Sequence, residues 1–226
     1  MELLQCIRKG AAHQRRKHHL DVYEAIYKRR DIRHFRTDPV PDDVLQRILN
    51  AAHHAGSVGF MQPWNFLVIR AKETKQQIFE LYKKANKAAA AQYQGEQRAL
   101  YDSLKLAGIM EADISLVVTC DTNRETGAGL GRQTMPETAV YSTCCAIENL
   151  WLAARAEGIG VGWVSIVDAD SAKKILGIPD NLTLVAYLCV GYPVTFEKKP
   201  MLETAGWQER VPLEDLVYYE KWATKR

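Results

Sequence analysis

The sequence has no long hydrophobic run, and this absence argues against a helical membrane span. Its longest apolar stretch lies near Leu184–Val190, far short of the about 20 residues that a transmembrane helix needs. Disorder is excluded as well, because 47% of the 226 residues are hydrophobic and 25% are charged, an ordinary globular composition. A chain of this length can bury a real core, so we expect one large domain with appendages and no membrane partner.

Cysteine is scarce, and its spacing suits neither zinc nor a redox pair. The five cysteines form no C-x-x-C motif, so a structural zinc site and a disulfide framework have no support. The adjacent His53 and His54 point in different directions and are poor joint ligands, so no metal is expected. We expect free, buried thiols in a reducing, cytoplasmic compartment. The cysteines are Cys6, Cys120, Cys144, Cys145 and Cys189.

Most of the chain lacks a surplus of positive charge. The net charge is +3, and residues 1–20 alone hold five basic residues against one acidic residue, whereas the other 206 hold 25 basic and 26 acidic. A folded nucleic-acid-binding protein carries its basic surplus on the fold, so no nucleic-acid partner is expected. We interpret residues 1–20 as a basic, flexible tail rather than a secretory signal, because only Leu3 and Leu4 stand together before the charges return. The domain then spans residues 21–226.

Helical and strand patterns alternate along that domain. The segment 137–157 is apolar nearly all round, which predicts a helix buried in a core or between subunits. The irregular segment 193–212 is long for a compact domain, and such an arm often lies on a partner chain. We expect strands at 64–69, 114–120, 160–166 and 182–192. We expect helices at 21–29, 41–52, 73–91, 137–157, 171–176 and 213–222.

Two common catalytic signatures are missing. The glycines of 158–162 enter a strand instead of opening a helix, which disfavours the G-x-G-x-x-G fingerprint of nicotinamide-binding folds. Ser165 does not stand in a G-x-S-x-G elbow, so serine hydrolase chemistry has no support. By itself Ser165 is most simply a strand serine bonded to backbone.

Two other segments offer groups that suit an anionic heterocycle. The segment Arg29–Arg33 reads Arg-Arg-Asp-Ile-Arg and ends a helix. Guanidiniums bind phosphate in bidentate fashion, although cations are also favourable at a helix C-terminus without any ligand. A carboxylate is unfavourable at a helix C-terminus, so this cationic cap does not explain Asp31. The loop 56–66 combines flexible glycines with the amides of Gln62 and Asn65, which suit a heterocyclic edge as well as an ordinary turn.

Together these segments resemble the nitroreductase-like FMN enzymes. The shared pattern is Arg29–Arg33, the Gln-Pro-Trp-Asn-Phe sequence at 62–66, and a late arginine, Arg210, before a C-terminal helix. Within that superfamily the chain looks like the 5,6-dimethylbenzimidazole synthases, aerobic enzymes of vitamin B12 biosynthesis. The closer resemblance depends on Asp31 together with Ser165, and it covers residues 20 to 226. It includes the stretches 59–66, 149–165 and 188–193.

The resemblance implies an α+β, nitroreductase-like fold, with a central, mostly antiparallel sheet flanked by helices. It also implies an intertwined homodimer with two FMN sites at the subunit interface, with residues 193–226 as an arm on the partner. Residues 88–108 would form a lid over the flavin ring. The implied FMN-binding residues are Arg29, Arg30, Asp31, Ile32, Arg33, Ser57, Gln62, Asn65, Leu104, Ser165 and Arg210.

The implied reaction consumes the flavin. Reduced FMN would react with O2 through a C4a-peroxyflavin and break into 5,6-dimethylbenzimidazole and erythrose 4-phosphate. The resemblance suggests Asp31 and Ser165 as catalytic residues: Asp31 would transfer protons over the flavin, and Ser165 would hydrogen-bond the isoalloxazine. The arginines Arg29, Arg30, Arg33 and Arg210 would hold the phosphate. NAD(P)H would act indirectly, as the source of electrons for the flavin. It would reduce the flavin either by itself or through an external flavin reductase.

Two other functions remain open at this point. A conventional NAD(P)H-dependent FMN enzyme, acting on nitroaromatics, quinones or halogenated tyrosines, would share the fold and the arginines but keep its flavin. A non-catalytic protein that stores or senses flavin would share the binding residues and yield no oxygen-dependent product. Asp31 with Ser165 favours the flavin-consuming reaction.

Overall fold

The computed structural model describes residues 20–224. The predicted basic tail, apart from residue 20, therefore lies outside the described residues. Within the described range, no helix is both long and apolar enough to cross a membrane. The same range holds no cluster of three or more His, Cys, Asp or Glu side chains that could bind a metal ion.

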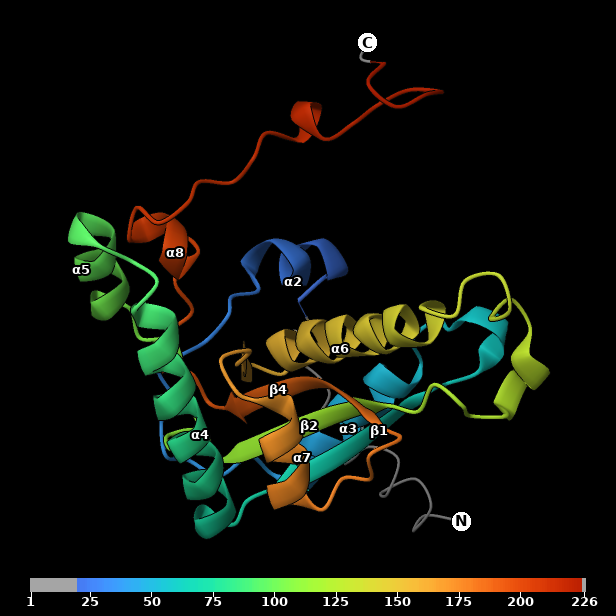
Figure 1. Cartoon of the computed structure of the whole chain (residues 1–226), viewed down its shortest axis with the longest axis horizontal. Coiled ribbons are helices and arrows are strands. Elements are labelled where there is room, and N and C mark those ends of the chain that lie inside the picture. The colour runs from blue at the N-terminus through green and yellow to red at the C-terminus, as the bar shows by residue number, and fades with distance from the viewer. Residues whose placement is uncertain (1–19, 225–226) are drawn as a thin grey trace, which may run out of the picture.

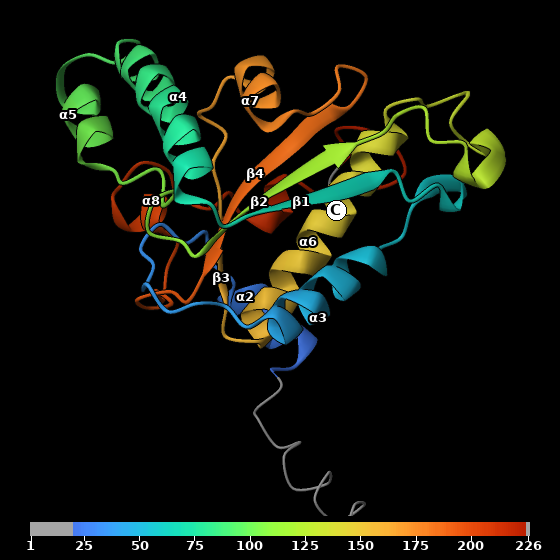
Figure 2. The same ribbon diagram turned by 90° about the horizontal axis from the view of Figure 1, so that it is seen from below.

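A four-stranded antiparallel sheet forms the centre of the structure (Figures 1 and 2). Its strands follow the order β1-β2-β4-β3, and all seven residues of β2 are buried. The continuous apolar run at 114–120 predicts such a central position, because both faces of the strand are covered. The strands are β1 (Trp64–Ile69), β2 (Ile114–Cys120), β3 (Gly160–Trp163) and β4 (Thr183–Gly191).

Helices cover both faces of the sheet, and each face has its own core. On one face, α3 and α6 pack with alternate β2 residues such as Leu116 and Val118. The other face is covered by α4 and α7, as Figure 2 shows, and its core includes Val117 and Tyr187. The helices are α2 (Val22–Lys28), α3 (Asp42–His53), α4 (Lys72–Ala90), α5 (Gly95–Ser103), α6 (Thr138–Ala156), α7 (Ala169–Leu176) and α8 (Met201–Thr204). Short 3₁₀ turns are η1 (Val58–Phe60), η2 (Thr126–Gly129) and η3 (Leu213–Asp215).

Helix α6 confirms the predicted 137–157 helix, but one of its faces is exposed. Its other faces lie in the core, with Ala146 and Leu150 fully buried. Tyr141 is 55% exposed, and Cys144 and Cys145 are also exposed. The expectation of buried thiols is therefore wrong for these two cysteines, because they lie on the side of α6 that turns away from the sheet. Cys120 and Cys189 are buried as predicted, and Cys6 lies outside the described residues.

Two predicted elements near the C-terminus are wrong in extent. The strand expected at 160–166 stops at Trp163, because its backbone hydrogen bonds to β4 end with the Val164 N–H, which binds the Tyr187 carbonyl at 2.9 Å. The helix expected at 213–222 is only the turn η3, since Leu213 and Leu216 are exposed and a short helix without packing is marginal. In Figure 1 the chain beyond α8 runs away from the body of the molecule.

Candidate functional site

The segment Arg29–Arg33 is held against the sheet by backbone contacts. Asp21 caps α2 by accepting the Glu24 N–H at 2.9 Å, and the chain becomes extended after Lys28. Ile32 then donates its N–H to the carbonyl of Val161 at 3.0 Å. A methyl group on Gly162 would lie 2.0 Å from the Ile32 carbonyl oxygen. The glycines of β3 therefore serve a close backbone approach by this segment.

Asp31 sits at the centre of a network formed by Arg33 and Trp163. Its Oδ1 accepts the Trp163 N–H at 2.9 Å and an Arg33 Nη1 hydrogen at 2.8 Å. Arg33 also reaches the other carboxylate oxygen and donates to the Trp163 carbonyl at 2.7 Å. Partial desolvation raises the pKa of Asp31, and the charge of Arg33 and the Trp163 N–H oppose that rise. The 44% of the side chain that remains exposed faces open cavities.

Arg30 carries a buried donor that no described residue uses. Its Nη1 binds the carbonyls of Tyr27 at 2.9 Å and Arg29 at 2.5 Å, and its Nη2 binds the carbonyl of Lys198. Its Nε is buried and has no hydrogen-bond partner among the described residues. Desolvation, and then the charges of Arg29 and Arg210, lower the pKa of Arg30. A buried donor among like charges fits an anionic ligand such as a phosphate.

Two cavities meet at Asp31. One has a volume of about 690 Å³ and brings together Arg29, Arg30, Arg33 and Arg210 beside Lys199. The other has a volume of about 610 Å³ and shares Arg30, Asp31 and Arg33 with the first. The second cavity is walled by Leu104 and its neighbours at the end of α5. The structure thus brings the cationic residues, Asp31 and Leu104 together around two adjoining cavities.

Aromatic contacts hold the predicted lid against the C-terminal segment. Tyr93 stacks on Tyr101 of α5 with ring centroids 4.9 Å apart. Trp207, which follows α8, contacts both rings at 5.4 and 6.2 Å. Since the segment around α8 lines both cavities, this cluster couples α5 to the wall of the site.

Ser165 does not line either of the cavities that meet at Asp31. It follows Trp163 by two residues, is exposed, and lines a smaller hollow of about 150 Å³ beside α7.

The second group of expected residues lies at the other end of α6. Ser57 accepts the Gln62 N–H at 3.1 Å, and the Val58 N–H binds Ser142 near the start of α6 at 3.1 Å. Arg30, by contrast, accepts a hydrogen bond from Trp151 at 3.3 Å. Nine residues of helix separate Ser142 from Trp151, roughly 14 Å along the axis. One chain therefore does not bring Ser57, Gln62 and Asn65 together with Arg29–Arg33.

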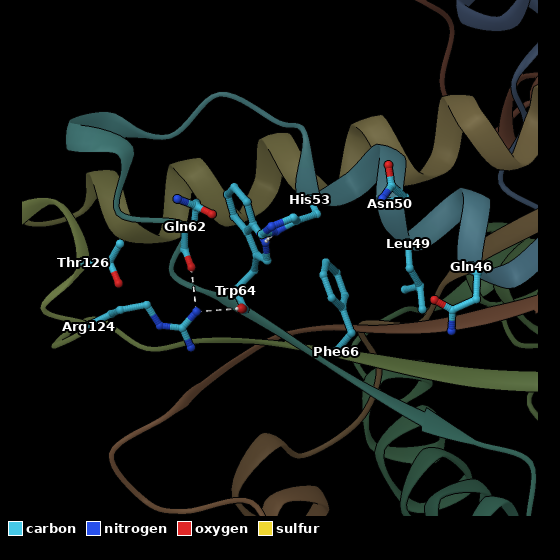
Figure 3. Close-up of a pocket in the computed structure, with 9 residues that line it drawn as sticks. All are labelled: Gln46, Leu49, Asn50, His53, Gln62, Trp64, Phe66, Arg124 and Thr126. Atoms are coloured by element: carbon cyan, nitrogen blue, oxygen red, sulfur yellow. Dashed lines mark hydrogen bonds between the residues drawn. The ribbon is translucent and has the colours of Figure 1, made fainter.

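Figure 3 shows what surrounds Gln62 instead: a separate cavity of about 410 Å³ between α3, β1 and the segment after β2. Arg124 reaches across this region and binds the carbonyls of Gln62 at 2.6 Å and Trp64 at 3.1 Å. Sequence reasoning missed Arg124 and Ser142, because their role depends on contacts with residues 59 or more positions away in the chain and neither stands in a motif.

Comparisons with known proteins show the family and the fold. The model of the nitroreductase family matches residues 26–192. A 5,6-dimethylbenzimidazole synthase of Rhodospirillum rubrum is 44% identical over 193 residues, covering 85% of this chain and 92% of the relative. One from Rhodobacter capsulatus is 40% identical over 191 residues, covering 84% and 92%. The structure of an iodotyrosine deiodinase bound to FMN and 3-iodo-L-tyrosine has a TM-score of 0.71 at 24% identity, covers 89% of this chain and all of that one, and shows the same fold.

Proposed function

The chain belongs to the nitroreductase family, and we propose that it is an enzyme that fragments reduced FMN with O2 into 5,6-dimethylbenzimidazole and erythrose 4-phosphate. The observation that carries the proposal is Asp31, an acid with a raised pKa where the two cavities meet. The proposal is also supported by the chain's identity of 44% and 40% to two 5,6-dimethylbenzimidazole synthases, of which it covers 92% of the length.

The arginine side of the site fits the FMN phosphate. Arg29, Arg30, Arg33 and Arg210 line one cavity, and the unused Nε of Arg30 supplies a donor for a phosphate oxygen. A dianionic phosphate would also relieve the repulsion between Arg30 and its cationic neighbours. In this arrangement Ile32 holds the segment in place through its backbone bond to β3.

The second cavity fits the ring end of the flavin. Reduced FMN supplies the electrons that O2 takes up. Asp31 reaches this cavity with a raised pKa, so it holds and releases a proton at a pH closer to neutrality than an ordinary aspartate. A single positioned acid or base contributes about 10²–10⁴-fold to a rate. Leu104 and the end of α5 line this cavity, and closure of α5 over it would exclude water from the reacting ring. Ser165, two residues after β3, lines a separate hollow in this chain, and its hydrogen bond to the ring system stays a prediction of the resemblance.

The complete site requires a second copy of the chain. Ser57, Gln62 and Asn65 lie at the opposite end of α6 from Arg29–Arg33, so one chain presents two half-sites. The exposed face of α6 around Tyr141, together with the exposed side chains of Val22 and Tyr23 on α2, provides an apolar surface for a partner. A two-fold homodimer would place the half-site of one protomer beside that of the other.

The proposal is tested by following flavin during turnover in air. The enzyme is incubated with excess chemically reduced FMN, and the flavin absorbance and benzimidazole fluorescence are recorded. We expect FMN to disappear as fluorescence of 5,6-dimethylbenzimidazole grows. Full recovery of oxidised FMN, together with NAD(P)H-dependent reduction of a nitroaromatic or quinone, would instead identify a conventional flavin reductase. Stable, tight flavin binding with no oxygen-dependent product would identify a storage or sensor protein.

A further inference from the structure

Arg124 binds three residues at the start of β1 and just before it. Its Nη1 donates to the carbonyl of Gln62 at 2.6 Å and to that of Trp64 at 3.1 Å (Figure 3). Its Nη2 donates to the side-chain oxygen of Asn65. The Asp121 N–H binds the carbonyl of Pro63 at 2.7 Å beside it. A planar guanidinium supplies this fork of donors, which a lysine ammonium does not reproduce.

The loop that Arg124 holds has an unfavourable backbone. Phe60 has φ 53° and Gln62 has φ 47°, in the left-handed region that non-glycine residues avoid. Phe60 is 74% exposed, so its own packing within this chain does not fix that conformation. The Ser57 hydroxyl and the Gln62 side chain bridge the loop internally, but Arg124 ties it to the body of the domain.

The segment that follows Arg124 packs against the same loop. A methyl group on Gly127 would lie 1.9 Å from the carbonyl oxygen of Gly59, and one on Gly59 would lie 2.3 Å from that of Leu130. Arg132 donates to the carbonyls of Thr122 and Arg124, both at 2.9 Å, and so fixes the backbone that carries the clamp. The two loops therefore lie backbone against backbone, and the hydrogen bonds of Arg124 and Arg132 hold them in place.

We infer that Arg124 is a positioning residue, which holds the Ser57–Asn65 segment in the shape that presents Ser57, Gln62 and Asn65 to the flavin. This inference rests on the proposed function, in which those three side chains contact FMN. Arg124 itself acts through the segment, because the hydrogen bonds of its Nη1 and Nη2 go to the acceptors of Gln62, Trp64 and Asn65.

The inference predicts a specific failure when the clamp is removed. With the loop released, reduced FMN would be bound less tightly and held less well during its reaction with O2. More of it would then be simply reoxidised, giving intact FMN and H2O2 from reduced FMN and O2, and less would become 5,6-dimethylbenzimidazole. A residue that only stabilises the fold would lower the melting temperature without changing this ratio of products.

The test compares Arg124→Met and Arg124→Lys with Arg70→Met and Arg70→Lys in the full-length protein. Arg70 is a matched control, because it also binds a backbone carbonyl, that of Val40 at 3.0 Å, but lies after the other end of β1. For each variant we measure FMN affinity by fluorescence titration, the ratio of benzimidazole to recovered FMN after aerobic reaction, and the melting temperature.

For Arg124→Met we expect about tenfold weaker FMN binding, the effect of losing hydrogen bonds from a charged group, and a product ratio shifted toward intact FMN. Arg124→Lys should fall between Arg124→Met and the unchanged protein, and both Arg70 variants should keep the ratio. Equal affinity and an equal product ratio in the Arg124 and Arg70 pairs would overturn the inference. If circular dichroism shows Arg124→Met unfolded, the two lysine variants decide. If the unchanged protein returns all its FMN, the proposed function fails, while the affinity comparison still tests Arg124.

Discussion

At the scale of single residues, Asp31 combines two opposing influences. Its surroundings desolvate the carboxylate and raise its pKa, while Arg33 and the Trp163 N–H stabilise the charged form. The carboxylate is thus fixed in direction but remains ready to take up a proton. That combination suits proton transfer. A carboxylate in a simple ion pair with an arginine would have a depressed pKa and would take up a proton less readily.

The raised pKa of Asp31 makes a prediction for Asp31→Asn. The variant should bind FMN and yield no 5,6-dimethylbenzimidazole, a loss of at least about 10²-fold in rate. In the flavin-free protein, the folded state binds the Asp31 proton more tightly than the unfolded state does. The unfolding free energy of the unchanged protein should therefore rise relative to Asp31→Asn as the pH falls from 7 through the raised pKa toward the usual aspartate value.

Urea unfolding of both proteins at several pH values measures this difference, and product analysis measures the rate. If Asp31→Asn forms benzimidazole at the rate of the unchanged protein, Asp31 has no catalytic role. A stability difference that moved in the opposite direction with pH would show that the pKa is depressed.

Arg30 should control flavin affinity rather than the course of the reaction. We expect Arg30→Ala to weaken FMN binding by roughly 10- to 100-fold, since the hydrogen bonds of a charged donor contribute about 1.5–3 kcal/mol. The products formed at saturating flavin should stay the same. Arg155→Ala is the matched control, because Arg155 binds the Lys28 carbonyl at 3.3 Å nearby but lines neither large cavity. Unchanged affinity in Arg30→Ala, measured by titration, would reject the phosphate assignment.

Sequence reasoning found the residues that belong to compact motifs and missed those that act across the fold. The clustered guanidiniums at 29–33 indicated an anion site, and the structure places them with Arg210 around one cavity. Arg124 gave no such signal, because its partners Gln62 and Asn65 are distant in sequence. A lone arginine after a strand has no pattern that separates it from a solvated side chain.

At the scale of elements, local signals predicted most helices and strands. Asp21 caps α2 and Gly177 ends α7 with φ 66°, as capping patterns indicate. The predictions failed where tertiary contacts decide. Strand β3 ends when its neighbour stops pairing, and the 213–222 segment lacks a surface to pack on in this chain. Periodicity does not carry that information.

The contact between α5 and Trp207 predicts the behaviour of the lid. Trp207→Ala removes the ring that touches both Tyr93 and Tyr101, so α5 should open more often. We expect faster amide hydrogen exchange across Gly95–Ser103, unchanged exchange in β2, and a smaller fraction of reduced FMN converted to benzimidazole. Unchanged exchange in α5 would show that the aromatic cluster does not restrain the lid.

At the scale of the whole molecule, the exposed face of α6 predicts a dimer. Tyr141→Arg places a charge on that face and should give a monomer that binds FMN at least tenfold more weakly, because each site then loses the contacts of Ser57, Gln62 and Asn65. Light scattering gives the mass and titration gives the affinity. Glu73→Arg, an exposed change on α4 across the sheet, should leave both unchanged. A fully active monomer would contradict the shared site.

The most direct test of the account is mass spectrometry of a single aerobic turnover. Enzyme loaded with reduced FMN under anaerobic conditions is exposed to air, and the small molecules are quantified. The account predicts 5,6-dimethylbenzimidazole and erythrose 4-phosphate, each in an amount equal to the FMN that is lost. Quantitative recovery of intact FMN, with neither fragment detected, would contradict it.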